Sequence, residues 1–266
     1  MEKEEKQKNS KVKRHKKKKN RILVVVRIVL VIAVITSATY ILLYFYNSYK
    51  NKNLYADILP NIQENRVNET GQESSVLVSA VKELQKENAD IKGWIKIDGT
   101  NINYPLLQTT DNDYYVTRNY KKEKSKYGSI FINSNSDLKD EKSHVLIYGH
   151  DMKDGQMFAG LINYTNKAFY EENLFITIAT DEKEEKYKII CVFKSRQFYE
   201  DETGVFRYYR YFNFNTQNEL KEYINNCKKE QLYDTKTDIT DNQIITLTTC
   251  EYSQDNGRLV VVAQKI

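Results

Sequence analysis

Residues 244–263 read IITLTTCEYSQDNGRLVVVA. Two apolar, β-branched runs, Ile244 to Thr249 and Arg258 to Ala263, flank a polar loop, which is the pattern of two strands joined by a turn. Cys250 ends the first run and Arg258 opens the second. If the two strands pair, the loop returns Arg258 close to Cys250, where a guanidinium can stabilise a thiolate or an oxyanion. Strand ends next to loops also commonly display reactive groups.

Six more short strands are predicted upstream, so the chain from Ile91 onward is mostly β. They are Trp94–Ile97, Ile102–Leu107, Gly128–Asn133, His144–Tyr148, Leu174–Ala179 and Tyr187–Phe193. Helical patterns are expected at Gln156–Tyr164 and, between the sixth and seventh strands, at Asn218–Leu232. Eight strands with few helices between them favour closure into a barrel, which leaves no exposed edge strand.

The N-terminus carries the pattern of a membrane anchor. Lys11 to Arg21 reads KVKRHKKKKNR, and Ile22 to Tyr46 is apolar apart from Arg27. The 19 residues from Ile28 to Tyr46 carry no charge, and as a helix they would span roughly 28 Å, close to a hydrocarbon core. A cleaved signal peptide would have a shorter apolar region followed by a small-residue cleavage site. Large residues follow here, so an uncleaved transmembrane helix is expected at residues 22–46.

Charge is distributed unevenly along the chain. Residues 1–50 hold 13 Lys/Arg and 3 Glu, a net charge of +10, whereas residues 51–266 hold 28 basic and 33 acidic residues. The positive-inside rule places the basic tail, residues 1–21, in the cytoplasm, with membrane lipid around the helix and the remainder outside the cell. Residues 47–90 are expected to form a stalk of two short helices, free or packed on the folded domain at residues 91–266. The mildly acidic outer part is unsuited to nucleic acid.

Reactive side chains are scarce in the outer part. Its histidines and cysteines are His144, His150, Cys191, Cys227 and Cys250. A zinc site needs clustered ligands at short spacings, and no such cluster or GxSxG elbow is present, so we expect no metal and no cofactor. Cys191 and Cys227 fall on apolar positions of a strand and a helix, which predicts small core residues.

The two histidines of the outer part differ in position. His144 begins a buried strand, which favours a structural or a surface residue over a catalytic one. His150 follows the end of that strand, after Gly149, and the glycine is expected to permit a sharp turn that aims the imidazole into a cleft. Position alone leaves both a catalytic and a structural role open for His150, Cys250 and Arg258.

Three local strings, in this chain order, resemble the sortase family, and class B sortases most closely. YGHDM surrounds His150, TLTTC ends at Cys250 and matches the TLxTC motif, and Arg258 matches the arginine of the next strand. Further strings typical of class B are NYPLLQTTDNDYY (103–115), YGSIFINSN (127–135), GHDMKDGQMFAGLINY (149–164) and FYEENLFITI (169–178). The resemblance runs from about Trp94 to the C-terminus.

The resemblance implies a closed, eight-stranded sortase-type β-barrel with N-terminal helices, in which the helix at 218–232 is a class B feature. It also implies a cysteine transpeptidase on the outer face of a Gram-positive membrane. Such an enzyme cleaves a C-terminal sorting motif of LPxTG or NPxTN type after threonine. It holds the secreted protein as a thioester and passes it to an amine of a cell-wall (lipid II-type) precursor.

The resemblance also assigns roles to residues. Cys250 would be the nucleophile, His150 the general acid and base, and Arg258 the donor to the substrate carbonyl and the oxyanion. Three further residues match substrate-groove positions: Asn112, Thr248 and Glu251. The backbone N–H of Glu251 is expected to be a second oxyanion donor, and the aromatic segment 198–214 is expected to wall the groove.

Three other functions stay open. A pilin-polymerising sortase of class C usually carries a DPW-like lid motif and a second membrane segment, and neither is found in residues 47–266, although some class B enzymes build pili. A cysteine peptidase that only hydrolyses would use the same triad with water in place of the amine. A membrane-tethered binding module without chemistry would not need Cys250, His150 and Arg258 together, and it would bind peptide without any turnover.

Overall fold

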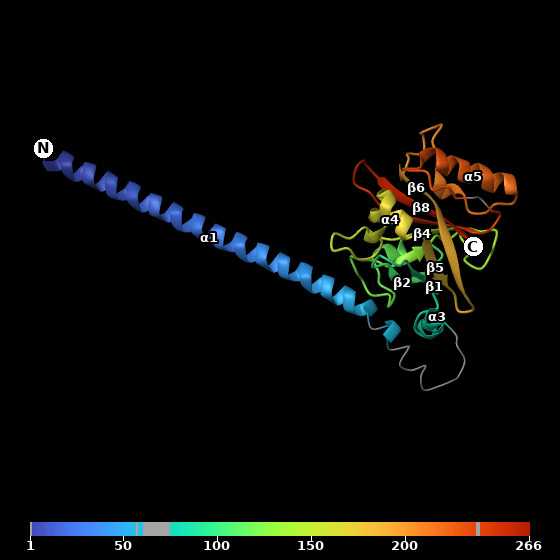
Figure 1. The fold of residues 1–266 in the computed structure, drawn as a ribbon. Coiled ribbons are helices and arrows are strands. Elements are labelled where there is room, and N and C mark those ends of the chain that lie inside the picture. Colours follow the sequence, from blue (N-terminus) through green and yellow to red (C-terminus); the bar gives the residue numbers. More distant parts are fainter. Residues whose placement is uncertain (1, 57, 61–74, 238–239) are drawn as a thin grey trace. The chain divides into compact units, whose positions relative to one another are not determined.

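The computed structural model (Figure 1) describes residues 2–56, 58–60, 75–237 and 240–266, with backbone alone for residues 2–22. The chain forms two compact units, residues 1–53 and 54–266. A single helix, α1 (Glu2–Ala56), covers the basic tail and the apolar segment, and from Leu23 onward it is long and apolar enough to cross a membrane. No glycine and no proline precedes Pro60, so nothing in the sequence breaks the helix at residues 21 or 46.

The expected stalk is not a pair of separate short helices. Its first half is the end of α1, its second half is α3 (Val76–Glu87), and residues 61–74 between them lie outside the described residues. The last residues of α1, from Leu54 onward, and α3 belong to the folded unit and pack within it. The ring of Tyr55 lies 5.0 Å from that of Tyr104, and α3 turns its apolar face towards β1 and β5 with buried Leu77, Ala80, Val81 and Leu84.

Eight strands close into a barrel in the order β1-β2-β3-β4-β7-β8-β6-β5. Their bounds are β1 (Ile91–Lys96), β2 (Asn103–Leu107), β3 (Ile130–Ile132), β4 (His144–Tyr148), β5 (Phe175–Ala179), β6 (Glu184–Arg196), β7 (Ile244–Cys250) and β8 (Gly257–Lys265). The pairs β2–β3 and β4–β7 are parallel and the other pairs are antiparallel. The predicted eight-stranded barrel is therefore confirmed.

The connecting helices are short, apart from α5. They are η1 (Tyr114–Val116), η2 (Ala159–Thr165), α4 (Lys167–Glu172), η3 (Tyr208–Arg210) and α5 (Gln217–Glu230). The prediction of a helix at Gln156–Tyr164 is wrong for its first three residues, because Gly155 and Met157 have φ of 79° and 57° and turn the chain there. The prediction of α5 is confirmed. The side chain of Thr216 caps it by accepting a hydrogen bond from the N–H of Glu219 at 3.2 Å.

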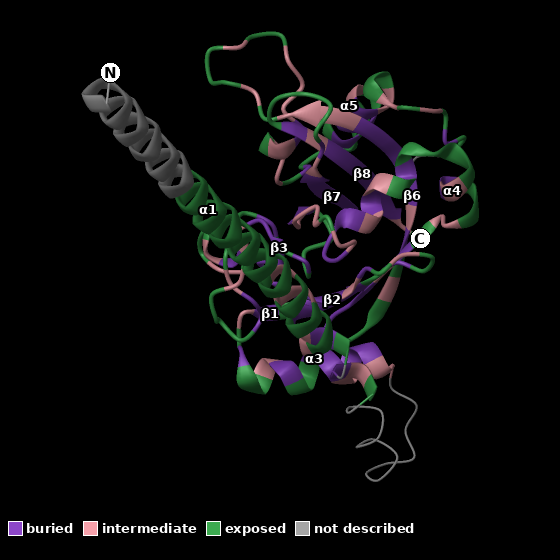
Figure 2. Cartoon of the chain, turned by 90° about the vertical axis from the view of Figure 1, so that its left-hand side faces the viewer, coloured by how far each residue is buried: buried purple, intermediate pink, exposed green. Residues whose placement is uncertain are grey.

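Strands β7 and β8 are buried on both faces, as Figure 2 shows by their colour. Leu247 and Val261 belong to the main core of the barrel, whereas Val260 and Val262 face a second core beneath α5. Burial on both faces explains why these strands read as nearly continuous apolar runs.

The second core holds the residues for which a structural role was predicted. Cys191 and Cys227 are fully buried there, and burial raises the pKa of both thiols, that of Cys191 to about 12. His144 is also fully buried, with Nδ1 on the carbonyl of Tyr211 at 2.8 Å and Nε2 on the hydroxyl of Thr246 at 2.7 Å. All three residues are therefore structural.

Candidate active site

The pairing of β7 with β8 and with β4 assembles the site. Cys250 and Arg258 are cross-strand partners at the loop end of the β7–β8 hairpin. β4 runs parallel to β7, with Tyr148 opposite Thr248, so both strands end at the same edge of the sheet. His150 and Cys250 each follow that register by two residues. His150 and Cys250, which are 100 residues apart in the chain, therefore lie at the same edge of the sheet.

Two hydrogen bonds hold the strand ends together beyond the regular ladder. The N–H of Gly149 donates to the carbonyl of Thr248 at 3.2 Å, and the hydroxyl of Thr249 donates to the carbonyl of Gly149 at 2.8 Å. The residue before His150 is therefore bonded to the two residues before Cys250.

Glycine at position 149 was expected to permit a sharp turn, but the structure shows a different requirement for it. Its backbone is outside the left-handed region, so no sharp turn requires it. Instead, a Cβ there would lie 2.5 Å from Cδ1 of Ile130 and 2.7 Å from Cγ of Phe158. The missing side chain lets the start of the His150 segment pack closely on the barrel.

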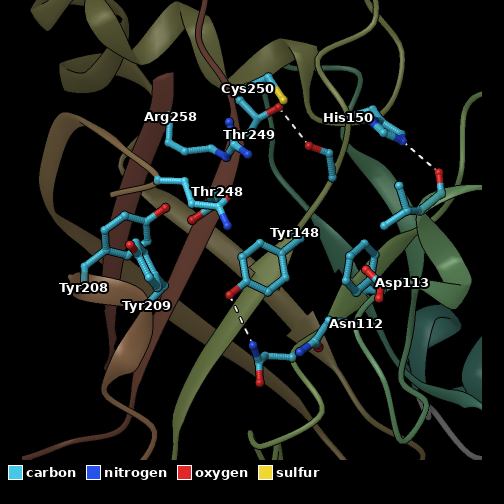
Figure 3. A pocket seen from close by; sticks show the side chains of 15 residues that line it. Asn112, Asp113, Tyr148, His150, Tyr208, Tyr209, Thr248, Thr249, Cys250 and Arg258 are labelled. Carbon is cyan, nitrogen blue, oxygen red and sulfur yellow. Dashed lines mark hydrogen bonds between the residues drawn. The ribbon is translucent and has the colours of Figure 1, made fainter. Parts of the chain in front are cut away.

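These strand ends open onto a cleft of about 400 Å³ (Figure 3). It is lined by Asn112, Asp113, Val116, Phe131, Asn133, Tyr148, Gly149, His150, Gln197, Tyr208, Tyr209, Thr248, Thr249, Cys250 and Arg258. All three residues of the predicted triad are among them, and Figure 3 shows Cys250 between His150 and Arg258.

The imidazole of His150 is oriented by the backbone. Its Nε2 lies 2.8 Å from the carbonyl oxygen of Val116, in η1. A carbonyl only accepts, so Nε2 carries a hydrogen and Nδ1 is the nitrogen left to exchange a proton in the cleft. Among the described residues, no hydrogen bond joins His150 to Cys250, a separation that a bound substrate can close.

One terminal nitrogen of the Arg258 guanidinium is bound to the backbone, and the other N–H groups are left for the cleft. Its Nη1 donates to the carbonyls of Gly257 at 2.8 Å and Asn256 at 3.2 Å. A guanidinium has five N–H donors in a planar fork, so the others are available to an oxygen near Cys250.

Two of the three expected groove residues line the cleft. Asn112 bonds through Oδ1 to the N–H of Ser134 at 2.8 Å, and Thr248 is buried at the cleft wall. Glu251 does not line it. Its carboxylate accepts from Nζ of Lys194 at 2.9 Å and from the hydroxyl of Ser253 at 2.5 Å, and these donors hold the pKa of this buried carboxyl below its ordinary value.

The backbone of Glu251 is also engaged. Its N–H donates to the carbonyl of Gly257 at 3.0 Å within the hairpin. The expected second oxyanion donor is therefore not free in this structure, and Arg258 is the donor that faces the cleft.

Some cleft residues were not singled out by the sequence. Tyr148 is one, and its hydroxyl accepts from Nδ2 of Asn133 at 3.2 Å, while burial raises its pKa. It stands two residues before His150, so the period of two along a strand was a signal for it. Tyr208 and Tyr209 fall inside the aromatic segment expected to wall the groove, and Phe131 falls inside the string at 127–135, whereas Gln197 carried no sequence signal.

The comparisons with known proteins agree with this geometry. Residues 95–266 match the sortase domain family. Sortase B of Listeria monocytogenes is 34% identical over 184 residues, which are 68% of this chain and 72% of that protein. A crystal structure of sortase B from B. anthracis in complex with AAEK1 superposes with a TM-score of 0.69 at 33% identity, over 84% of this chain and 99% of that one.

A second solved structure is the Staphylococcus aureus sortase B–substrate complex. It superposes with a TM-score of 0.71 at 27% identity, over 83% of this chain and 98% of that one. Family match, curated relatives and barrel topology thus agree. The chain belongs to the sortase family and, within it, to the class B cysteine transpeptidases.

Proposed function

We propose that this chain is a membrane-anchored sortase that cleaves a C-terminal sorting motif of LPxTG or NPxTN type after threonine and transfers the protein to an amine of a cell-wall precursor. The observation that carries this proposal is the arrangement of Cys250, His150 and Arg258 at one edge of the barrel, around one cleft. The substrate complex of S. aureus sortase B supports substrate binding in a barrel of this kind.

In the first half-reaction, the thiolate of Cys250 attacks the threonine carbonyl and forms a C–S bond. Arg258 donates hydrogen bonds to the oxygen that becomes negative, and this stabilises the tetrahedral intermediate. The C–N bond then breaks, and Nδ1 of His150 gives its proton to the departing amine. The reacting form needs a thiolate beside an imidazolium, and this form need be only a fraction of the resting enzyme.

The second half-reaction reverses these roles. The acceptor amine attacks the thioester carbonyl, Nδ1 of His150 takes a proton from the amine, and the thiolate of Cys250 leaves as the new amide forms. The bond from Nε2–H to the carbonyl of Val116 persists in both halves, so one ring orientation serves as acid and as base. Water in place of the amine would give hydrolysis.

The motif would lie along the cleft beside the catalytic residues. Asn112 and Thr248 line the cleft, and Tyr208 and Tyr209 offer aromatic surface on the same side as Thr248 (Figure 3). Placement outside the cell follows from charge. The apolar part of α1 would cross the membrane with the basic tail in the cytoplasm, and residues 54–266 would meet secreted proteins and wall precursors.

A peptide assay tests the proposed function. The full chain in detergent micelles is incubated with LPxTG, NPxTN and PPxTG peptides, with and without an added amine, beside Cys250→Ala. We expect cleavage after threonine of at least one peptide, an amide product when amine is present, and no product from Cys250→Ala. Free acid alone at high amine would support the hydrolytic peptidase, and peptide binding without cleavage would support the binding module.

A further inference from the structure

One wall of the cleft comes from the two ends of a single loop, residues 197–209, here called the wall loop. Gln197 directly follows β6, Tyr208 and Tyr209 stand at the far end in η3, and these three residues line the cleft. Residues 198–207 between them do not line it. Whatever fixes the two ends of the wall loop therefore fixes the shape of this side of the cleft.

The carboxylate of Glu202 ties the loop to the barrel. Arg196, the last residue of β6, donates from Nη1 to Oε1 at 3.0 Å and from Nη2 to Oε2. The N–H of Tyr199 donates to the same Oε1 at 2.7 Å. A paired fork of this kind fixes direction as well as distance.

The far end of the wall loop is bonded to the same two residues, Tyr199 and Glu202. Nη2 of Arg207 donates to the carbonyls of Tyr199 at 2.5 Å and Glu202 at 2.8 Å, and its guanidinium lies 5.9 Å from the ring of Phe198. The N–H of Phe198 donates to the hydroxyl of Tyr209 at 3.1 Å. The carboxylate of Glu202 thus binds Arg196 of the barrel and the first arm of the loop, and its backbone carbonyl binds Arg207 of the second arm. Phe198, next to Tyr199, links this arrangement to the hydroxyl of Tyr209 in the cleft.

The hydrogen bonds among Arg196, Tyr199, Glu202 and Arg207 are here called the clamp. None of these four residues belongs to either hydrophobic core. Tyr208 is anchored separately, because it is 1% exposed and packs edge-on against Phe193 at 5.7 Å between ring centres. The N–H of Gln197 also donates to the carbonyl of Asn256 at 3.0 Å, and the ring of Tyr209 packs edge-on against that of Tyr208 at 5.2 Å. Loss of the carboxylate of Glu202 would therefore loosen the arm that carries Phe198 and Tyr199, and with it the hydrogen bond to the hydroxyl of Tyr209, while the barrel and Tyr208 stay in place.

We propose that Glu202 is a positioning residue for the sorting motif, holding the wall loop in its peptide-binding form before the peptide arrives. The proposal rests on the proposed function. A wall that is ordered in advance removes an ordering cost from peptide binding, whereas chemistry at Cys250 does not depend on it. Loss of the clamp should raise KM and leave kcat nearly unchanged.

The test is the peptide assay with the full chain and Glu202→Gln, a variant that keeps the side-chain shape but loses the charge. We expect KM for the motif peptide to rise about five- to tenfold, with kcat within about twofold. Arg196→Lys should behave alike because it loses the fork, and the double variant should be no worse than either single one.

Glu200→Gln is the matched control. Glu200 stands in the same loop and pairs with Arg210 at 2.6 Å, but its side chain is 85% exposed and bonds to no residue of the cleft. Its KM should equal that of the wild type. An unchanged KM in Glu202→Gln, an equal rise in Glu200→Gln, or a loss confined to kcat would overturn the inference while the proposed function stands. If the wild type cleaves no peptide, both fail.

Discussion

At the scale of single residues, environment separates the three cysteines and the two histidines of the folded unit. Cys191 and Cys227 are buried thiols with raised pKa, whereas Cys250 is partly exposed at the cleft. His144 has both ring nitrogens engaged inside the second core, whereas His150 keeps Nδ1 for the cleft. The sequence was sufficient for this division, because apolar neighbours predicted the burial of Cys191 and Cys227, and the motifs of the resemblance, not position alone, singled out His150 and Cys250.

The sequence was not sufficient for Glu251. A carboxylate directly after the nucleophile is compatible with a groove contact, and only the fold shows that Lys194 of β6 and Ser253 take it away from the cleft. Partners that are distant in sequence leave no local pattern. The clamp at Glu202 joins residues that are close in sequence, but they lie in an irregular loop, where no period shows which side chains meet.

Arg258→Lys should lower kcat severely although the charge is kept. A lysine offers a point charge without the planar fork, so the oxyanion loses directed donors. We expect kcat to fall about 100- to 1,000-fold, the cost of losing an oxyanion donor. Arg210→Lys, on the exposed side of the wall loop, is the control. Equal kcat values for wild type and Arg258→Lys would rule out oxyanion stabilisation by Arg258.

His144 should make the fold sensitive to acid. Burial lowers its pKa from 6.5 to about 4, so the unfolded chain takes up a proton at higher pH than the folded chain does. This stability is fully present above pH 6.5 and decreases by about 3 kcal/mol as the pH falls to 4. The measurement is the urea midpoint against pH for wild type and His144→Gln. If the two slopes coincide between pH 6.5 and 4, His144 is not the group responsible.

At the scale of elements, the strands were predictable because their apolar runs are set by burial on one or both faces. The short elements were not. A single α-helical turn such as α4 has too few residues for a periodic pattern, and η2 begins only after two positive-φ residues have turned the chain. Helix α1 is long enough to be recognised, and its apolar residues predict the membrane-spanning segment. They do not predict where the helix begins and ends.

Gly149→Ala should separate catalysis from folding. The new Cβ would collide with Ile130 and Phe158, and relief of that collision displaces the adjoining His150. A displacement of about 1 Å can cost on the order of 100-fold, so we expect kcat to fall about 10- to 100-fold. Gly93→Ala is equally crowded, 2.7 Å from the carbonyl of Ala179 in the neighbouring strand β5. Both variants should lose thermal stability, and only Gly149→Ala should lose kcat per folded molecule.

At the scale of the whole molecule, an apolar helix long enough to cross a membrane precedes a closed barrel, and the catalytic residues line a cleft at the ends of β4 and β7. The barrel was predictable from the number and shortness of the strands. The closure order was not, because parallel pairing of β4 with β7 links segments about 100 residues apart. That pairing is nevertheless what makes His150 and Cys250 neighbours.

Chemical labelling of Cys250 can show on which side of the membrane the folded unit lies. In intact Gram-positive cells without a free thiol on other surface proteins, a membrane-impermeant maleimide should label this chain at Cys250, since Cys191 and Cys227 are buried. Cys250→Ala should abolish the labelling. Labelling only after lysis would place the folded unit on the cytoplasmic side and contradict the proposed orientation.

Independence from metal is a further expectation for the whole enzyme. Within the described ranges, no three His, Cys, Asp or Glu side chains form a group suited to a metal ion, and the proposed steps use only protein groups. Turnover should be the same after dialysis against EDTA. A loss of activity that added Ca²⁺ or Zn²⁺ restores would show that an essential ion had been missed.

The central claim is a covalent thioester on Cys250, and an intact-mass measurement tests it most directly. The full chain is mixed with a cleavable motif peptide without amine, quenched in acid during turnover and weighed by mass spectrometry. We predict an added mass equal to the peptide up to and including its threonine, located on Cys250 by digestion and removed when an amine is supplied. Cleavage of the peptide with no acylated enzyme at any time, or an adduct on another residue, would contradict the account.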